Sequence, residues 1–184
     1  MSPVSSRSVA RIVVVGSLVL TGISSLAATD YGVGRPATME EIRTWDIDVS
    51  PSGEGLPSGR GTVSQGALVY AKKCAGCHGA TGREGPFDKL VGGRDTLATG
   101  TPVKTIGSYW PYATTLFDYI YRAMPFDAPQ SLTPNEVYAV TAWLLAQNGI
   151  VEGDVTLDAA SLAAVKMPNR LGFILDPRPD IPSP

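Results

Sequence analysis

The stretch Cys74-Ala-Gly-Cys-His78 decides how this chain folds, because it gathers reactive side chains within one helical turn. The 184-residue sequence contains 2 cysteines and 1 histidine, and all three lie in this stretch. Residues three apart lie on one face of a helix, so both thiols point the same way and the imidazole follows directly. A disulfide or a thioredoxin-like redox motif would not need His78, and a zinc site would need further Cys or His ligands.

The pattern C-x-x-C-H is the attachment signature of a c-type haem. Two thioethers must reach two carbons on one edge of the porphyrin, and the next residue must turn its imidazole under the iron. We therefore predict one covalent haem c, attached through Cys74 and Cys77, with His78 as the proximal iron ligand. The alternative use of the two cysteines is a thiol–disulfide oxidoreductase, which a mass measurement showing covalent haem would eliminate.

Residues on either side of the motif resemble class I cytochromes c. Gly66-x-x-x-Tyr70-x-x-x-Cys74 matches the first helix of that family, where a glycine allows close helix crossing and an aromatic residue packs beside the haem. A later helix that contains Trp143 is similar to the family's C-terminal helix, which crosses the first one. The resemblance implies an all-α class I cytochrome c fold, with helices and long loops wrapped around one haem.

The sixth iron ligand cannot be a second histidine, because the sequence has only one. A methionine thioether is the usual alternative and raises the reduction potential. Met124 in Ala-Met-Pro lies just before the last core helix, where the class I resemblance places the ligand, so we predict Met124 and keep Met167 in Lys-Met-Pro-Asn-Arg as the alternative. Either methionine can instead fill the core. A labile sixth site would indicate a haem sensor or enzyme, which carbon monoxide binding would reveal.

A few further residues are candidates for contact with the predicted haem or with His78. Arg83 and Arg94 can pair with propionates or remain solvated surface charges. Trp110 and the tyrosines beside it can line the haem edge, although packing is the favoured interpretation. Pro86 resembles the proline that class I cytochromes place against the proximal histidine, and its carbonyl is expected to orient the imidazole of His78.

Periodicity and capping signals predict short helices joined by long loops. A Thr-x-x-Glu capping box starts a helix at Thr38, and Thr133-Pro-Asn-Glu136 starts another. Residues 79–108 are rich in glycine and are predicted to form a loop, and no strand of convincing period is found. The predicted helices are 38–45, 65–77 capped by Ser64, 112–123, 135–147, and a short one from the cap Asp158 to residue 165.

The two ends of the sequence differ in composition from its middle. Residues 1–27 combine basic residues, a short apolar run and small residues, as in a secretory signal peptide, the alternative being a retained membrane anchor. Export would place the mature protein in the periplasm with no membrane span. We assign 28–60 to an irregular extension, 61–150 to the cytochrome domain and 151–184 to a C-terminal extension with a Pro-rich tail. The formal net charge of −2 argues against nucleic-acid binding.

Several runs resemble one branch of the family, the SoxD-like cytochrome subunit of sulfur dehydrogenase in the periplasmic thiosulfate-oxidising (Sox) system. These runs are residues 32–37, 45–49, 112–129, 148–150 and 167–170. The resemblance implies an electron-transfer subunit that is not itself catalytic on substrate, with a molybdenum-cofactor sulfur or sulfite dehydrogenase as partner. This chain has one C-x-x-C-H, so it departs from the two-haem members.

Two questions about partners stay open at this point. A free-standing soluble carrier that passes electrons to other cytochromes or a terminal oxidase is the alternative function. The extension over 28–60 is too polar to form its own core, so it either wraps along a partner subunit or forms a strap over this protein's own surface.

Overall fold

The computed structural model describes residues 32–174. The chain divides into two units, Met1–Ala37 and Thr38–Pro184, and every described helix and strand belongs to the second. Of the first unit only 32–37 are described, and they form bends and irregular chain. The predicted signal peptide over 1–27 lies outside the described residues. Within 32–174, no helix is both long enough and apolar enough to cross a membrane.

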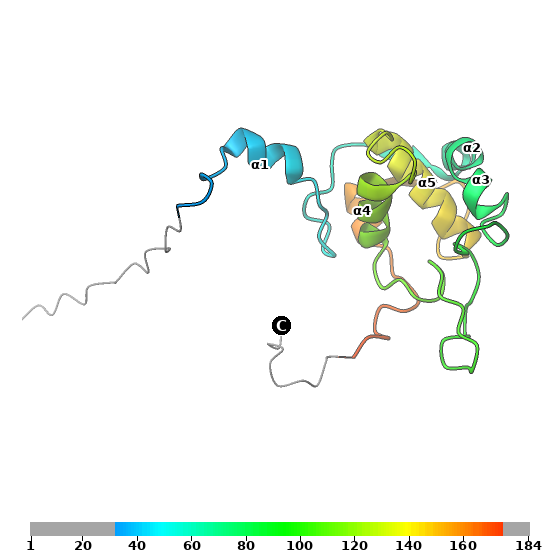
Figure 1. Cartoon of the computed structure of the whole chain (residues 1–184). Helices are drawn as coiled ribbons and strands as arrows, with labels where there is room; N and C mark the ends of the chain where they lie inside the picture. The colour runs from blue at the N-terminus through cyan, green and yellow to red at the C-terminus, as the bar shows by residue number, and fades with distance from the viewer. Residues whose placement is uncertain (1–31, 175–184) are drawn as a thin grey trace, which may run out of the picture. The chain divides into compact units, whose positions relative to one another are not determined.

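Helices dominate the second unit, as the predicted all-α class requires (Figure 1). Regular structure is absent from 79–112, so the predicted loop is confirmed and extends four residues further. The elements are α1 Met39–Trp45, β1 Arg60–Thr62, α2 Val63–Lys73, α3 Ala75–His78, α4 Ala113–Ala123, α5 Pro134–Gln147, β2 Thr156–Asp158 and α6 Ala159–Ala163.

Capping boxes start four of these helices, and they explain both the agreement and one error of the prediction. The boxes at Thr38 and Thr133 begin α1 and α5 as predicted. The predicted cap of α2 is wrong: Thr62, not Ser64, accepts the Gln65 amide, at 3.2 Å. Ser64 is instead engaged by Asp154, whose carboxylate accepts the Ser64 amide at 2.7 Å. Because a distant carboxylate binds Ser64, the cap lies at Thr62 and α2 begins two residues earlier than predicted.

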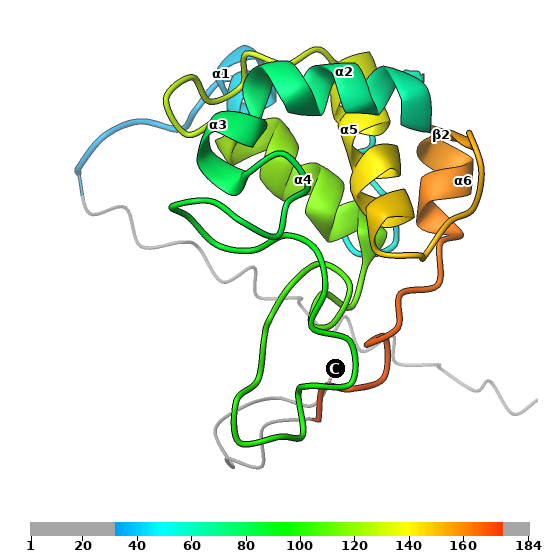
Figure 2. The same ribbon diagram turned by 90° about the vertical axis from the view of Figure 1, so that its right-hand side faces the viewer.

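The crossing of α2 over α5 is the tightest contact between helices, and Figure 2 shows α2 lying across α5. A Cβ on Gly66 would lie 1.9 Å from the Ala139 carbonyl oxygen and 2.8 Å from the Trp143 Cβ. Only glycine leaves room for this approach, as the class I resemblance implied. The crossing stacks Tyr70 on Trp143 with ring centroids 3.9 Å apart.

One two-stranded antiparallel pair, β1 with β2, was not predicted. Arg60 pairs with Asp158 and Gly61 with Leu157 in its register. Each strand has three residues, too few for an alternating pattern to be recognised in the sequence. Gly61 also packs on α5, since a Cβ there would lie 2.4 Å from the Ala139 amide nitrogen. The pair therefore joins the segments before α2 and before α6, and Gly61 holds it against α5.

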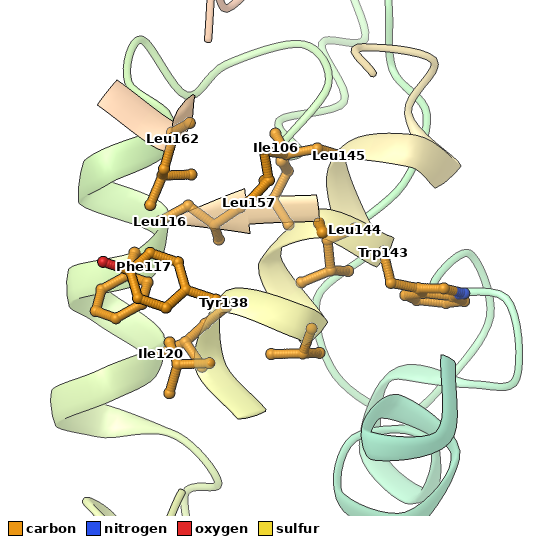
Figure 3. Close-up of a cluster of buried hydrophobic side chains, with 14 of the residues drawn as sticks. Ile106, Leu116, Phe117, Ile120, Tyr138, Trp143, Leu144, Leu145, Leu157 and Leu162 are labelled. Carbon is orange, nitrogen blue, oxygen red and sulfur yellow. The ribbon is translucent and has the colours of Figure 1, made fainter. Parts of the chain in front are cut away.

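The apolar core lies between α4, α5 and the segment that carries β2 and α6 (Figure 3). Phe117 of α4 and Tyr138 of α5 meet at its centre, with ring centroids 4.5 Å apart. Figure 3 shows Trp143 at the side of the cluster that faces α2. Other buried members are Ile106, Leu116, Ile120, Leu144, Leu145, Leu157, Leu162 and Met167.

The segment 48–60 is a strap over the protein's own α4 and α5, the second of the two roles considered for the extension. Val49 is buried, and its amide donates to the Asp118 carboxylate at 2.8 Å. The Tyr138 hydroxyl donates to the Pro57 carbonyl at 2.9 Å. The preceding helix α1 behaves differently, because none of its residues is buried. The extension is therefore part strap and part exposed helix.

The helix crossing can be tested by adding a single methyl group. Gly66→Ala should lower the free energy of unfolding by about 3 kcal/mol or more, because backbone atoms of α5 occupy the space of the new Cβ. Gly100→Ala is the matched control, since a Cβ at Gly100 meets nothing within 4 Å. Chemical denaturation of both variants measures the difference. Equal stabilities would contradict the close crossing.

Candidate haem-binding site

The predicted attachment motif lies where α2 ends and α3 begins. Cys74 caps both helices with φ −122° and ψ −35°, so the predicted continuous helix over 65–77 is interrupted there. The Cys77 and His78 amides donate to the Cys74 carbonyl at 3.1 and 3.0 Å and close the single turn. Both cysteines are free thiols, Cys74 half-buried and Cys77 exposed. One turn thus presents two thiols and an imidazole, the set that attachment to one porphyrin edge requires.

A tight loop fixes the end of this turn. Gly79 has φ 79°, and a Cβ there would lie 1.3 Å from the Glu84 carbonyl oxygen. The Glu84 carboxylate accepts the Thr81 hydroxyl and the Arg83 amide, and the bond from Thr81 contributes most to lowering its pKa. The chain therefore folds back immediately after His78. Arg83, a candidate for a propionate, is held here through its backbone while its side chain is exposed.

The imidazole of His78 is oriented by a backbone carbonyl, although not by the predicted one. Nδ1 lies 2.9 Å from the Asp88 carbonyl oxygen, whereas Pro86 was expected to supply this acceptor. A carbonyl oxygen can only accept, so Nδ1 carries a proton in this contact, and in the neutral imidazole the lone pair is then on Nε2. Such a bond to the second ring nitrogen fixes the orientation and raises the basicity of a metal-ligating histidine. The ring is therefore prepared to bind a metal through Nε2.

Tyr70 links the helix crossing to the loop behind the motif. Its hydroxyl donates to the Gly79 carbonyl at 2.9 Å, and burial raises its pKa to about 12, so the hydroxyl stays protonated at physiological pH. Burial also raises the pKa of the neighbouring Cys74 thiol to about 11. Tyr70 is buried and Cys74 is half-buried, so one side of the motif is packed against protein.

Asn148 is a positioning residue that the sequence analysis had seen only as a helix stop. Its side-chain oxygen accepts the Gly92 amide at 3.1 Å, and its amide nitrogen donates to the Leu90 carbonyl at 3.2 Å. Its own carbonyl accepts from the Arg94 guanidinium at 3.1 Å. The end of α5 thus holds the far half of the loop, and Arg94 is engaged there. No short sequence pattern predicts these contacts, because they join positions more than fifty residues apart.

The methionines occupy contrasting places. Met124 caps the C-terminus of α4 and is half-buried. Met167 has an exposed fraction of 3% and belongs to the apolar core, so protein atoms already surround it. Met39 lies on the exposed helix α1. Of these, Met124 combines a position next to the apolar core with a side chain that protein does not fully cover.

The residues present fit a haem c better than a zinc ion. Within 32–174, no cluster of three or more His, Cys, Asp or Glu side chains could hold a metal ion, so a zinc site lacks its ligands. A haem requires from the protein only two thiols, one imidazole with a free Nε2 and an apolar wall. Half-buried Leu90, Trp110 and Tyr121 pack against the core and are available as such a wall.

Comparison with known proteins gives a consistent result. Residues 61–144 match the family described as "Cytochrome C oxidase, cbb3-type, subunit III". The crystal structure of the sulfane dehydrogenase SoxCD from Paracoccus pantotrophus contains a chain that is 45% identical to this one. That match covers 81% of this chain and 74% of the other, with a TM-score of 0.75. A search of the curated proteins found no match to the sequence.

The chain belongs to the c-type cytochromes and has the class I cytochrome fold, as predicted. Membership of this family implies haem c as the cofactor, which the C-x-x-C-H motif had indicated. Within the family, the chain is similar to a component of SoxCD, so the predicted resemblance to SoxD-like cytochromes is confirmed.

The role of Asn148 can be tested by removing its amide. Asn148→Ala should lower the free energy of unfolding by about 1–3 kcal/mol, because the partly buried Gly92 amide loses its side-chain acceptor and the Leu90 carbonyl loses one of two donors. Gln147→Ala, which removes the neighbouring exposed amide, is the matched control. Chemical denaturation of the haem-loaded variants measures both effects. Loss of stability in the control alone would show that Asn148 does not hold the loop.

Proposed function

We propose that this protein is a periplasmic mono-haem cytochrome that transfers single electrons as the cytochrome subunit, or the acceptor, of a molybdenum-dependent sulfur or sulfite dehydrogenase in thiosulfate oxidation. One observation carries this proposal. The similarity to the SoxCD chain covers 81% of this sequence, which is more than the 61–144 matched by the general family. The likeness therefore includes parts of the extensions, which a haem domain does not require. A single C-x-x-C-H supports one haem.

In this function the residues of the chain hold and insulate the cofactor. Haem c, when bound, supplies the one-electron Fe(III)/Fe(II) couple. Cys74 and Cys77 would hold the group, and His78, oriented by the Asp88 carbonyl, would ligate the iron. The apolar residues packed against the core would exclude water from it, and this exclusion and the iron ligands together would tune the potential. In this proposal the chain transfers the electrons, and the sulfur chemistry belongs to the dehydrogenase partner.

Met124 is the sixth ligand in this proposal. Burial supports the choice, because a ligating sulfur needs an open side toward the iron. Met124 is half-buried at the end of α4, whereas the surroundings of Met167 are closed by core residues. In this proposal Met167 packs in the apolar core, which the sequence analysis considered possible for either methionine.

Two substitutions separate the methionines. Met124→Ala should abolish the weak near-infrared sulfur-to-iron band, and its reduced form should bind carbon monoxide at neutral pH. Met167→Ala should keep the band and lose about 2–5 kcal/mol of stability through a core cavity. Absorption spectra and denaturation curves of both variants measure this.

The same spectra discriminate the remaining functions. Loss of the band only in Met167→Ala would reverse the ligand assignment. Carbon monoxide binding by the reduced parent protein would favour a haem sensor and count against a six-coordinate carrier.

A free-standing carrier to a terminal oxidase is the second candidate. The description of the matching family, an oxidase subunit, favours it. That match is confined to 61–144, the part that any class I cytochrome would share, so it says less about the partner than the longer match does.

Helix α1 offers a surface for a dehydrogenase partner. Its capping box defines the helix, yet Trp45 is 83% exposed and Met39 70% exposed. A helix of seven residues is too short to be stable by itself in water, so contact with a partner would stabilise it. We place the contact with the molybdenum subunit on this face.

The partner is tested by co-expressing the full chain with a sulfite-oxidase-like molybdenum subunit. The two proteins should co-purify, and thiosulfate or sulfite, supplied separately, should reduce the haem only when the molybdenum subunit is present. Trp45→Ala should weaken co-purification about tenfold, the scale of a buried aromatic anchor. Leu171→Ala removes another exposed apolar side chain and serves as the control.

Two outcomes would contradict this function. Haem reduction at equal rates with and without the molybdenum subunit would remove the dehydrogenase role. Rapid oxidation of the reduced protein by oxidase-containing membranes, without co-purification, would favour the free carrier.

A further inference from the structure

The C-terminal extension packs on the aromatic run that precedes α4. Asn169 Nδ2 donates to the Tyr109 carbonyl oxygen at 2.7 Å. The guanidinium carbon of Arg170 lies 3.9 Å from the centroid of the Tyr112 ring, within the range of a cation–π interaction. Phe173 meets the Tyr109 ring edge-on, with centroids 5.3 Å apart. Three contacts of different kinds therefore join two short segments that are far apart in the sequence.

The C-terminal segment 167–173 is fixed to the apolar core at its first residue. Met167, its first residue, is buried in the core, and its carbonyl accepts the Arg170 amide at 3.2 Å. The Gly172 amide donates to the Asn169 carbonyl at 3.1 Å. The segment 167–173 is thus a turn pinned to the core at one end, and we call it the C-terminal clamp. The Met-Pro-Asn-Arg motif, considered above for its methionine, makes its contacts through Asn169 and Arg170.

The C-terminal clamp contacts the residue at which α4 starts. Tyr112 is the N-cap residue of that helix and makes no side-chain capping bond, so its ring is free to pack against the arginine. Trp110 contacts Tyr119, one of the residues of α4, with ring centroids 5.8 Å apart. A helix of this length behaves as a rigid rod, so the position of its first turn fixes that of its last. The C-cap at the other end is Met124.

We propose that Asn169 and Arg170 are positioning residues for Met124, acting through α4 to hold its thioether where it binds iron. This inference rests on the proposed function, in which Met124 is the sixth ligand. Neither residue touches the iron or its ligand. Their effect is to disfavour states in which α4 shifts and the sulfur leaves. Without the clamp, an external ligand should displace Met124 more easily.

Imidazole binding to the oxidised holoprotein measures this displacement directly. Arg170→Ala should raise the apparent imidazole affinity about two- to fivefold, the factor expected for loss of one solvent-exposed cation–π contact. Asn169→Ala should act in the same direction. Arg170→Lys retains a cation above the ring and should restore most of the parent behaviour. Lys166→Ala removes an equal charge from the same extension and should leave the affinity unchanged.

Thermal unfolding of each variant separates positioning from general stability. The proposal is overturned if Arg170→Ala lowers the melting temperature but leaves the imidazole affinity and the near-infrared band at parent values. It is equally overturned if Lys166→Ala matches Arg170→Ala. Failure of the underlying function looks different: Met124→Ala would then keep the band, whatever the clamp variants do.

Discussion

The close approach of α2 to α5 is the constraint on which the rest of the structure depends. Gly66 lets the two backbones meet, and the crossing stacks Tyr70 on Trp143. Tyr70 then reaches the Gly79 carbonyl, on the far side of the attachment turn. The direction of α2 and the position of its C-cap residue, Cys74, follow from this packing. A contact between two helices thus decides where the reactive turn stands.

The long loop after the motif is held by polar contacts rather than by regular structure. Such a loop within a compact domain needs a reason, and the haem c that family membership implies would supply one if the loop encloses it. Its backbone groups are satisfied by side chains: Glu84 near its start, Asn148 in its second half, and Ser108 near its end, whose hydroxyl donates to the Val103 carbonyl at 2.7 Å. Each bond replaces one that a helix or sheet would have provided.

Features that depend on neighbouring residues could be predicted from the sequence. The capping boxes at Thr38 and Thr133, the helix start at Asp158 and the C-x-x-C-H turn all follow from spacing within a few positions. Features that depend on distant partners could not. The Asp154 carboxylate accepts the Ser64 amide, and Thr62 rather than Ser64 is the N-cap of α2. These contacts are decided by tertiary packing, which a single sequence does not display.

The same distinction between local and distant contacts applies to the candidate haem site. The spacing of Cys74, Cys77 and His78 carries its own chemistry, so the attachment turn was recognisable at once. The acceptor for His78 depends on the path of the following loop, which brings the Asp88 carbonyl rather than that of Pro86 to Nδ1. Loop paths are set by contacts such as those of Asn148, and these have no local signature.

The two candidate axial ligands are held by different parts of the chain. His78 follows α2, whose place is fixed by α5 within the segment that the general family shares. Met124 ends α4, which is gripped by both extensions: the strap binds Asp118, and the C-terminal clamp covers Tyr112. Both extensions thus contact α4 or its N-cap directly, and the strap also contacts α5, through the Tyr138 hydroxyl. If Met124 ligates the iron as proposed, these contacts to α4 would give the extensions a means of adjusting ligation, and hence reduction potential, from outside the C-x-x-C-H turn.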